Sequence, residues 1–439
     1  MYRITRAYAI ILAATMAVST ALAGYHPPAH AQSSHATVSI ILWHQEQPPE
    51  RVKRIQQMID AFNASHPGMH ISQQVQSWGN IYQKAVSAVQ SGNQPEILFT
   101  IPDFTTVVKA TGAVQPVDGV IAAMDKAHHF LKAALLPYHY DGHYWAVPLY
   151  GMVQSLWYRK DLFRKAHIAH APATWDELLA AAKALTHGRQ YGIGLPASKS
   201  LYTDQTIYDF MVTARAQDLF AKNGSLRFDN PATVRAYSFY NTLWRSSPPG
   251  STSWIWGDAE AAFDAGTVAM IIQFTTIAGY DKQSGHSPAD LGVAPIPVPS
   301  GGQHGSIFYS NAAMILTKDP AKQRVARTFL EWLLQPPQYG RFLNMEPCLF
   351  LPETEDGSKA ASFWNDPLAI KYRSQLRQMV AETKHGYLFG FTEGTVNPNI
   401  GKISGQNMLA QTVQAMIVSK KSPAAAVRAG QQAMAAAIH

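Results

Sequence analysis

Apolar residues recur along the first hundred positions with alternating strand and helix periodicity. Residues 38–43 form an apolar run typical of a buried strand, and residues 49–62 then repeat apolar side chains at helical spacing. Further strands are predicted at 70–75 and 96–101, with a helix at 81–89 between them. This alternation predicts an α/β fold with largely parallel, doubly wound sheets, in which ligands bind beyond the carboxyl ends of the strands.

The second half of the chain continues the alternation. Helical spacing predicts helices at 175–185, 232–244 and 258–265, and the alanine-rich tail predicts further helices between 406 and 438. Residues 299–306 hold three glycines and are the most linker-like stretch inside the chain. At 439 residues, 47% of them hydrophobic, the chain is too long for one typical core, so we expect two lobes.

The stretch from residue 141 to residue 163 combines a turn with a long extended run. Asp141-Gly142 predicts a tight hairpin turn, and the aromatic and β-branched residues that follow predict an extended segment. Pro148 cannot donate to a strand ladder and Gly151 has no side chain. We therefore expect the strand to leave one sheet and enter another at these two residues, as a hinge would.

This stretch resembles the interlobe crossover of the extracellular solute-binding proteins of sugar ABC transporters, the family that includes the maltose-binding protein. Further motifs of the family follow in its order at residues 174–178, 265–270 and 291–297, so the resemblance covers the chain from about residue 36 to its end. One departure stands at residues 273–276, Gln-Phe-Thr-Thr, where the family commonly has a glycine-proline-tryptophan run. Within the crossover, the matching positions are Asp141, Gly142, Tyr144, Pro148, Tyr158, Lys160, Asp161 and Phe163.

The resemblance implies a two-lobed periplasmic-binding-protein fold of type II, in which doubly wound sheets are joined by a hinge of three crossings. It implies an N-terminal lobe of residues 36–150 plus 306–353 and a C-terminal lobe of residues 151–305 plus 354–439. The implied function is the substrate-binding component of an ABC-type carbohydrate importer. Such a protein binds a mono- or oligosaccharide in the interlobe cleft, as a monomer, and delivers it to the permease subunits in the membrane.

The amino-terminal sequence indicates an export signal. Arg3 and Arg6 form a positive region, residues 7–23 are apolar, and residues 29–31 offer the small residues that a signal peptidase reads. Residues 1–31 are therefore predicted to be a signal peptide that leads to the periplasm, and no cysteine lies nearby to carry a lipid anchor. Cleavage at the end of the apolar segment and an uncleaved membrane anchor remain open.

Sugars present C–H faces on which aromatic rings stack and hydroxyls that polar side chains bind. Strand ends and the resemblance to the family together point to thirteen candidates for ligand binding. They are Trp43, His44, Trp78, Asp103, Tyr150, Gly151, Trp254, Trp256, Gln273, Phe274, Tyr309, Asn311 and Phe389.

Several of these candidates carry a simpler alternative. Asp103 follows a predicted strand and matches a family aspartate that accepts hydrogen bonds from hydroxyls, yet it could equally cap the helix that starts there. Trp254 and Trp256 are predicted to share one face of an extended stretch and form a stacking platform, although core packing is the alternative. In place of the missing family motif, Gln273 and Phe274 would supply the amide and the ring.

Other chemistries find little support. The histidines at 128, 129, 139 and 143 do not predict a metal site, because His139 and His143 flank the Asp-Gly turn instead of sharing a helix face. No dinucleotide or phosphate-binding loop indicates a cofactor. The net charge of +7 is not clustered, which argues against nucleic acid. The single Cys348 is expected to be a buried small hydrophobe.

An exported glycoside hydrolase is the main alternative function. It would need two carboxylates facing one cleft. The acids available for such a pair, Glu46, Asp103, Asp258 and Glu260, are not paired by any motif.

Overall fold

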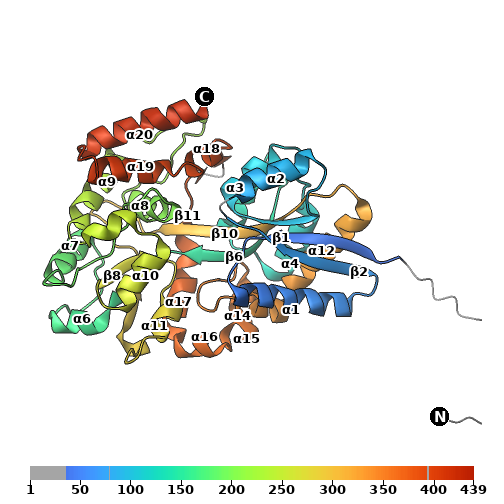
Figure 1. Ribbon diagram of the computed structural model, residues 1–439, viewed down its shortest axis with the longest axis horizontal. Helices are drawn as coiled ribbons and strands as arrows, with labels where there is room; N and C mark the ends of the chain where they lie inside the picture. The colour runs from blue at the N-terminus through green and yellow to red at the C-terminus, as the bar shows by residue number, and fades with distance from the viewer. Residues whose placement is uncertain (1–35, 79, 393–394) are drawn as a thin grey trace, which may run out of the picture. The chain divides into compact units, whose positions relative to one another are not determined.

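The computed structural model describes residues 36–439 except positions 79, 393 and 394, so the predicted signal peptide lies outside the described residues. Two main sheets organise the segment Thr37–His439 (Figure 1). The six-stranded sheet contains β1 (Val38–His44), β2 (Met69–Val75), β3 (Ile97–Thr100), β6 (Val147–Val153), β10 (Ser306–Ile315) and β11 (Gly386–Tyr387). The three-stranded sheet contains β7 (Ser155–Arg159), β8 (Met270–Gln273) and β9 (Leu291–Ala294).

The predicted parallel pairing of strands is found in part of the six-stranded sheet. β1 pairs in parallel with β2 and β3, whereas β10 runs antiparallel to β3 and β6. In the smaller sheet, β7 lies between β8 and β9 and pairs antiparallel with both. Two short hairpins are formed by β4 (His139–Tyr140) with β5 (His143–Tyr144), and by β12 (Phe391–Thr392) with β13 (Thr395–Val396).

Helices cover both sheets. Those whose apolar faces pack with the six-stranded sheet or beside it are α1 (Pro49–Ser65), α2 (Ile81–Gln90), α3 (Pro102–Lys109), α4 (Asp118–His128), α5 (Lys132–Leu135), α12 (Pro320–Leu333) and α13 (Pro336–Leu343). The middle of the chain forms α6 (Lys160–Lys165), α7 (Trp175–Ala184), α8 (Leu201–Thr213), α9 (Pro231–Trp244), α10 (Trp256–Asp264) and α11 (Ile277–Asp281). Short 3₁₀ helices are η1 (Leu136–Tyr138), η2 (Pro249–Ser253), η3 (Pro288–Asp290) and η4 (Thr383–His385).

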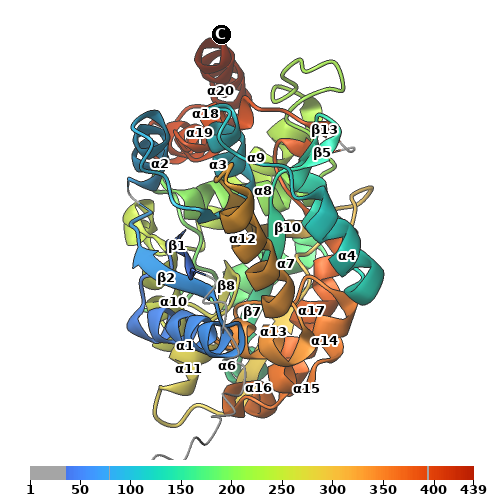
Figure 2. The same ribbon diagram turned by 90° about the vertical axis from the view of Figure 1, so that its right-hand side faces the viewer.

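The carboxyl-terminal helices are spread over the molecule. α14 (Glu355–Lys359) and α15 (Ala361–Trp364) contact α13, α16 (Pro367–Lys371) follows, and α17 (Arg373–Glu382) packs on β9. Figures 1 and 2 both show α18 (Ile400–Ser404) beside α3, while α19 (Met408–Ile417) and α20 (Pro423–Ile438) pack on α8 and α9. The assignment of residues 354–439 to a single lobe, like the other lobe boundaries, stays a prediction.

The chain changes sheets later than expected. Pro148 and Gly151 both lie inside β6, and the break falls at Gln154, the single residue between β6 and β7. Pro148 is tolerated because the register between β6 and β10 shifts at this point, so Leu149 has no opposite residue. The predicted hairpin turn does form, with positive φ of 55° at Asp141 and 80° at Gly142, as a two-residue turn of type I′ requires.

Buried hydrogen bonds tie the crossing segments together. Asp209 of α8 accepts a hydrogen bond from the Ile307 backbone N–H at 2.8 Å and one from the Ser306 hydroxyl at 3.2 Å. The same hydroxyl lies 2.5 Å from the carbonyl oxygen of Gln154. One aspartate therefore connects α8 to the start of β10 and, through Ser306, to the residue at which the chain changes sheets.

Cys348 is buried, as expected, and forms no disulfide. Burial also raises the pKa of its thiol far above the usual range. Among the described residues, no helix combines the length and apolar character needed to cross a membrane.

Gly192 is expected to be the glycine least tolerant of alanine, because an added Cβ would overlap the backbone carbonyl group of Ala182. Backbone cannot move aside as a flexible side chain can, so Gly192→Ala should lower the free energy of unfolding by about 1–3 kcal/mol or more. Gly250→Ala is the matched control, since an added Cβ there meets nothing within 4 Å. Denaturant melts of both variants measure the difference, and equal stability of the two would contradict the packing described here.

Candidate ligand site

Asp103 lies in the first turn of α3, directly beyond β3, and is buried. Its Oδ2 accepts hydrogen bonds from the hydroxyls of Tyr82 at 2.8 Å and Ser404 at 2.7 Å, which come from α2 and α18. The N-cap residue of α3 is Ile101, which has no side-chain capping bond, but hydrogen bonding with the backbone N–H groups of Asp103 and Phe104 favours the charged form of the Asp103 carboxyl. The alternative in which Asp103 caps the helix therefore stays a prediction. Oδ1 is buried without a hydrogen-bond partner among the described residues.

Tyr309 of β10 lies near both Asp103 and Gln205. Burial, together with the nearby carboxyl groups of Asp103 and Asp204, raises its pKa well above the usual range, and its hydroxyl interacts with the side chain of Gln205. The Gln205 amide oxygen in turn accepts a hydrogen bond from the Trp256 indole at 3.0 Å. The Phe389 ring stands 6.4 Å from that of Tyr309. Residues from α3, β10, α8 and α10 thus meet in one buried polar and aromatic group.

Trp256 is the first residue of α10, so the extended stretch predicted for the two tryptophans ends at Ile255. The Gln273 amide points back to the Trp256 carbonyl oxygen at 3.5 Å, and the Gln273 side-chain oxygen accepts from the Phe274 backbone N–H. Both Gln273 and Phe274 are buried. Trp254 is half-buried, and its carbonyl oxygen accepts a hydrogen bond from Ser198 at 2.6 Å.

A second buried group surrounds Tyr150, whose hydroxyl donates to Glu46 at 2.6 Å. Glu46 also pairs with Arg51 at 2.7 Å, and Arg51 pairs with Glu346 at 2.8 Å. Glu260 of α10 is close enough for Glu346 and Arg51 to influence its pKa, which burial, with Asp264 and Glu346, raises to about 8. This group holds one guanidinium among several carboxyl groups.

Trp43 and His44 do not meet, because successive residues of β1 point to opposite faces of the sheet. The Trp43 indole donates to Gln74 and lies under Lys84 of α2. The His44 ring contacts the Gln73 side chain at 2.7 Å on the side of α1, and burial lowers its pKa.

Three further candidates differ in their surroundings. Asn311 stands opposite Tyr150 in the strand ladder, with its side-chain nitrogen buried and unpartnered among the described residues. An added Cβ on Gly151 would meet the ring of Phe308, so glycine is needed there for packing. Trp78 is the most exposed candidate, at 39%.

Sequence reasoning missed the polar partners inside the site. Tyr82 and Gln205 sit on helices whose inward faces also carry ordinary core residues, and Ser404 lies 301 positions from Asp103. Asp204 was missed for the same reason. Its Oδ1 accepts a hydrogen bond from the Ala410 backbone N–H, and its Oδ2 is buried without a partner in the described part of the chain. No local motif marks any of the four.

Two of the four acids considered for a glycoside hydrolase have structural partners. Glu46 is paired with Arg51, and Asp258 accepts a hydrogen bond from the Ile255 backbone N–H at the start of α10. In residues 36–439, apart from the three positions that the structure does not describe, no three histidine, cysteine or acidic side chains gather as a metal site would require.

Comparison with known protein families identifies the family of this chain. Residues 47–339 match the sequence model of the bacterial extracellular solute-binding proteins. The chain belongs to this family. The resemblance inferred from the crossover motifs is therefore confirmed, and the family and its solved members are solute-binding proteins.

Three relatives illustrate how far the likeness extends. The Escherichia coli (strain K12) protein YcjN, named as a periplasmic-binding protein of an ABC transporter, is 24% identical over 409 residues, which cover 91% of this chain and 93% of YcjN. The sugar-binding protein MalE of Xanthomonas citri is 19% identical with a TM-score of 0.75, covering 91% of this chain and 97% of its own. An ABC transporter solute-binding protein of Agrobacterium radiobacter K84, solved with ribitol, is 21% identical with a TM-score of 0.73, covering 91% and 98%. These structures confirm the predicted two-lobed fold.

Proposed function

We propose that this solute-binding protein binds a carbohydrate or sugar alcohol at the group formed by Asp103, Tyr309 and Trp256. The observation that carries the proposal is the buried Oδ1 of Asp103, which has no hydrogen-bond partner among the described residues, in a carboxyl group that lies near Tyr309. A buried acceptor without a partner costs about 1–3 kcal/mol, and a ligand hydroxyl would remove that cost. Tyr150, Gln273, Phe274, Asn311 and Phe389 complete the proposed lining, while Trp43, His44, Trp78, Gly151 and Trp254 are further candidates.

We expect the bound ligand to be imported by an ABC transporter. MalE of Xanthomonas citri is a sugar-binding protein, and the Agrobacterium protein was solved with a sugar alcohol, which supports ligands rich in hydroxyls. The predicted signal peptide of residues 1–31 supports a periplasmic location, as does the extracellular character of the family. We propose that the protein delivers its ligand to the permease of an ABC importer, as a monomer with the two predicted lobes.

A thermal-shift screen tests the ligand class directly. Because binding to the native state alone raises stability by about 2.7 kcal/mol at a hundredfold excess over Kd, a true ligand should raise the melting temperature measurably. Hexoses, pentitols, disaccharides and longer oligosaccharides form the panel, with amino acids as the control class. A shift by amino acids alone would contradict the proposal, and cleavage of an oligosaccharide during incubation would favour the hydrolase.

Closure of the predicted lobes over the ligand should reduce the radius of gyration. The short connection at Gln154 and the hydrogen bonds at Ser306 leave few residues to absorb such a motion, which favours a hinge between two states. Small-angle scattering with and without a sugar identified by the screen measures the change. A sugar that binds with no change of radius would contradict hinge closure, and a sugar that does not bind is the control.

A further inference from the structure

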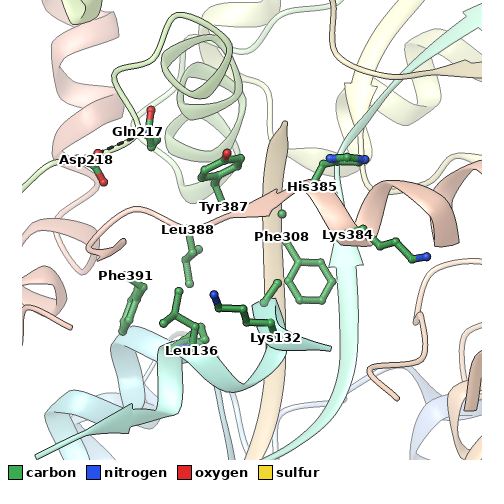
Figure 3. A pocket seen from close by; sticks show the side chains of 13 residues that line it. Lys132, Leu136, Gln217, Asp218, Phe308, Lys384, His385, Tyr387, Leu388 and Phe391 are labelled. Atoms are coloured by element: carbon green, nitrogen blue, oxygen red, sulfur yellow. Dashed lines mark hydrogen bonds between the residues drawn. The ribbon is translucent and has the colours of Figure 1, made fainter. Parts of the chain in front are cut away.

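Asp103 is closed off from a ligand in the arrangement that the structure shows, since its side chain, including Oδ1, is buried. A cavity of about 370 Å³ among α5, the loop after α8, β10 and residues 384–391 does not reach it, because none of the candidate ligand residues lines that cavity (Figure 3). Phe308 lines the cavity, whereas its neighbour Tyr309 points to the opposite face of β10. A sugar therefore reaches Asp103 only if an element that covers this residue moves.

Two elements cover the Asp103 carboxyl group. Its Oδ2 accepts one hydrogen bond from Tyr82 of α2 at 2.8 Å and another from Ser404 of α18 at 2.7 Å. The chain runs from α2 through β3 directly into α3, so α2 and α3 are both held by short connections to the same strand of the six-stranded sheet. α18 comes from the carboxyl-terminal part of the chain and leads into α19, which packs on α8. Of the two covers, α18 is therefore the one that can leave Asp103 without disturbing this sheet.

The contact between α18 and α3 is close and lies directly on the turn that holds Asp103. A Cβ added to Gly401 would lie 3.1 Å from Cγ2 of Val107 and 3.5 Å from the carbonyl oxygen of Asp103. On its other side, α18 contacts α19 and α20, and Nζ of Lys402 donates to the carbonyl oxygen of Ile438 at 3.1 Å. The short helix α18 thus joins α3 on one side to the last two helices on the other.

We propose that α18 is a strap over the sugar site, which parts from α3 to admit the ligand and returns to Asp103 when the site closes. The strap rests on the proposed function, because Asp103 has to be reached only if it binds the ligand. α18 moves with α19 and α20, whereas Tyr82 stays on Asp103 in both states. The bond from Ser404 to the buried carboxyl group then exists only in the closed state and favours that state.

A disulfide between α3 and α18 tests the strap without any sugar. The double variant Val107→Cys with Gly401→Cys brings two thiols together, since Val107 is the side chain that a Cβ at position 401 would meet first. The oxidised double variant should have a smaller radius of gyration in small-angle scattering than the reduced one, because only the reduced protein opens. Each single-cysteine variant, treated with the same oxidant, is the control. Equal radii for the oxidised and reduced double variant would overturn the proposal.

Uptake of a sugar found by thermal shift gives a second readout of the same variant. The oxidised protein should take up this sugar at least about tenfold more slowly than the reduced protein, and reduction should restore the rate, because the strap blocks entry while it is fixed. Equally fast uptake in both forms would overturn the strap and leave the proposed function intact. If the wild-type protein binds no sugar, the proposed function fails, and the scattering still decides whether α18 opens and closes.

Ser404→Ala tests the hydrogen bond without a cross-link. Tyr82 still donates to Asp103 in this variant, so the ranking between epimers should stay as in the wild type. Release of every sugar should become about tenfold faster, because the closed state has lost a bond to a buried carboxyl group. Ser419→Ala, at an exposed serine just beyond α19, is the control. Release at the wild-type rate, or a changed epimer ranking, would show that Ser404 does not hold a strap.

Discussion

Asp103→Ala is expected to weaken binding of the preferred sugar by roughly 10- to 100-fold and to flatten the ranking between epimers. A hydrogen bond to a charged group contributes about 1.5–3 kcal/mol, and it depends on where the ligand hydroxyl points. Trp256→Ala should instead weaken all bound sugars by similar factors, on the order of tenfold, because a stacked ring supplies contact area. Calorimetry of both variants with two epimers measures the contrast.

Two further variants separate binding from stability in this experiment. Asp103→Ala also leaves the hydroxyls of Tyr82 and Ser404 without their acceptor, whereas Asp103→Asn keeps an oxygen for them. Asp60→Ala, on the exposed face of α1, is the control. If both Asp103 variants melt lower but keep the epimer ranking, Asp103 has only a structural role.

The second large effect concerns pH and the buried Asp209. Burial raises the pKa of this carboxyl to about 8, so the folded protein holds a proton that the unfolded chain releases above about pH 4. Because the folded state binds more protons in this window, the stability of the protein should fall as pH rises from about 4 to about 8. The loss should reach a few kcal/mol at most, at roughly 1.4 kcal/mol per unit of pKa difference.

Asp209→Asn isolates this contribution. Asparagine keeps the acceptor for Ser306 and Ile307 but carries no charge, so the variant should lose less stability between pH 5 and pH 9 than the wild-type protein. Glu260, with a pKa raised to about 8, and Asp264, raised to about 6, contribute with the same sign in both proteins and cancel in the comparison. Denaturant unfolding at each pH provides the measurement, with Asp60→Asn as control. Parallel pH profiles for the wild type and Asp209→Asn would show that Asp209 does not hold the proton.

Elements with one apolar face could be predicted from the sequence, and elements buried on every side could not. The helix α1 was expected at 49–62 and spans Pro49–Ser65, because its buried residues repeat on one face. The helix α8 went unpredicted because all its residues from Tyr202 to Thr213 are buried, which removes any periodic contrast between polar and apolar positions.

The candidate site shows the same division between local and long-range information. Asp103 could be singled out because it directly follows a strand, a position visible in the sequence. Its partners Tyr82 and Ser404 are brought to it only by the packing of α2 and α18 against α3. For Trp43 and His44, the strand end was predicted correctly, yet strand alternation sends the two side chains to different faces.

The burial of Cys348 makes this protein convenient for fluorescence work. A thiol reacts with maleimide dyes as its thiolate, and here burial both shields the sulfur and raises its pKa. Cysteines introduced at exposed positions, one in each predicted lobe, would therefore take up a donor and an acceptor dye while the native thiol stays unlabelled. The natural chain can thus report the opening and closing of single molecules without first being stripped of its own cysteine.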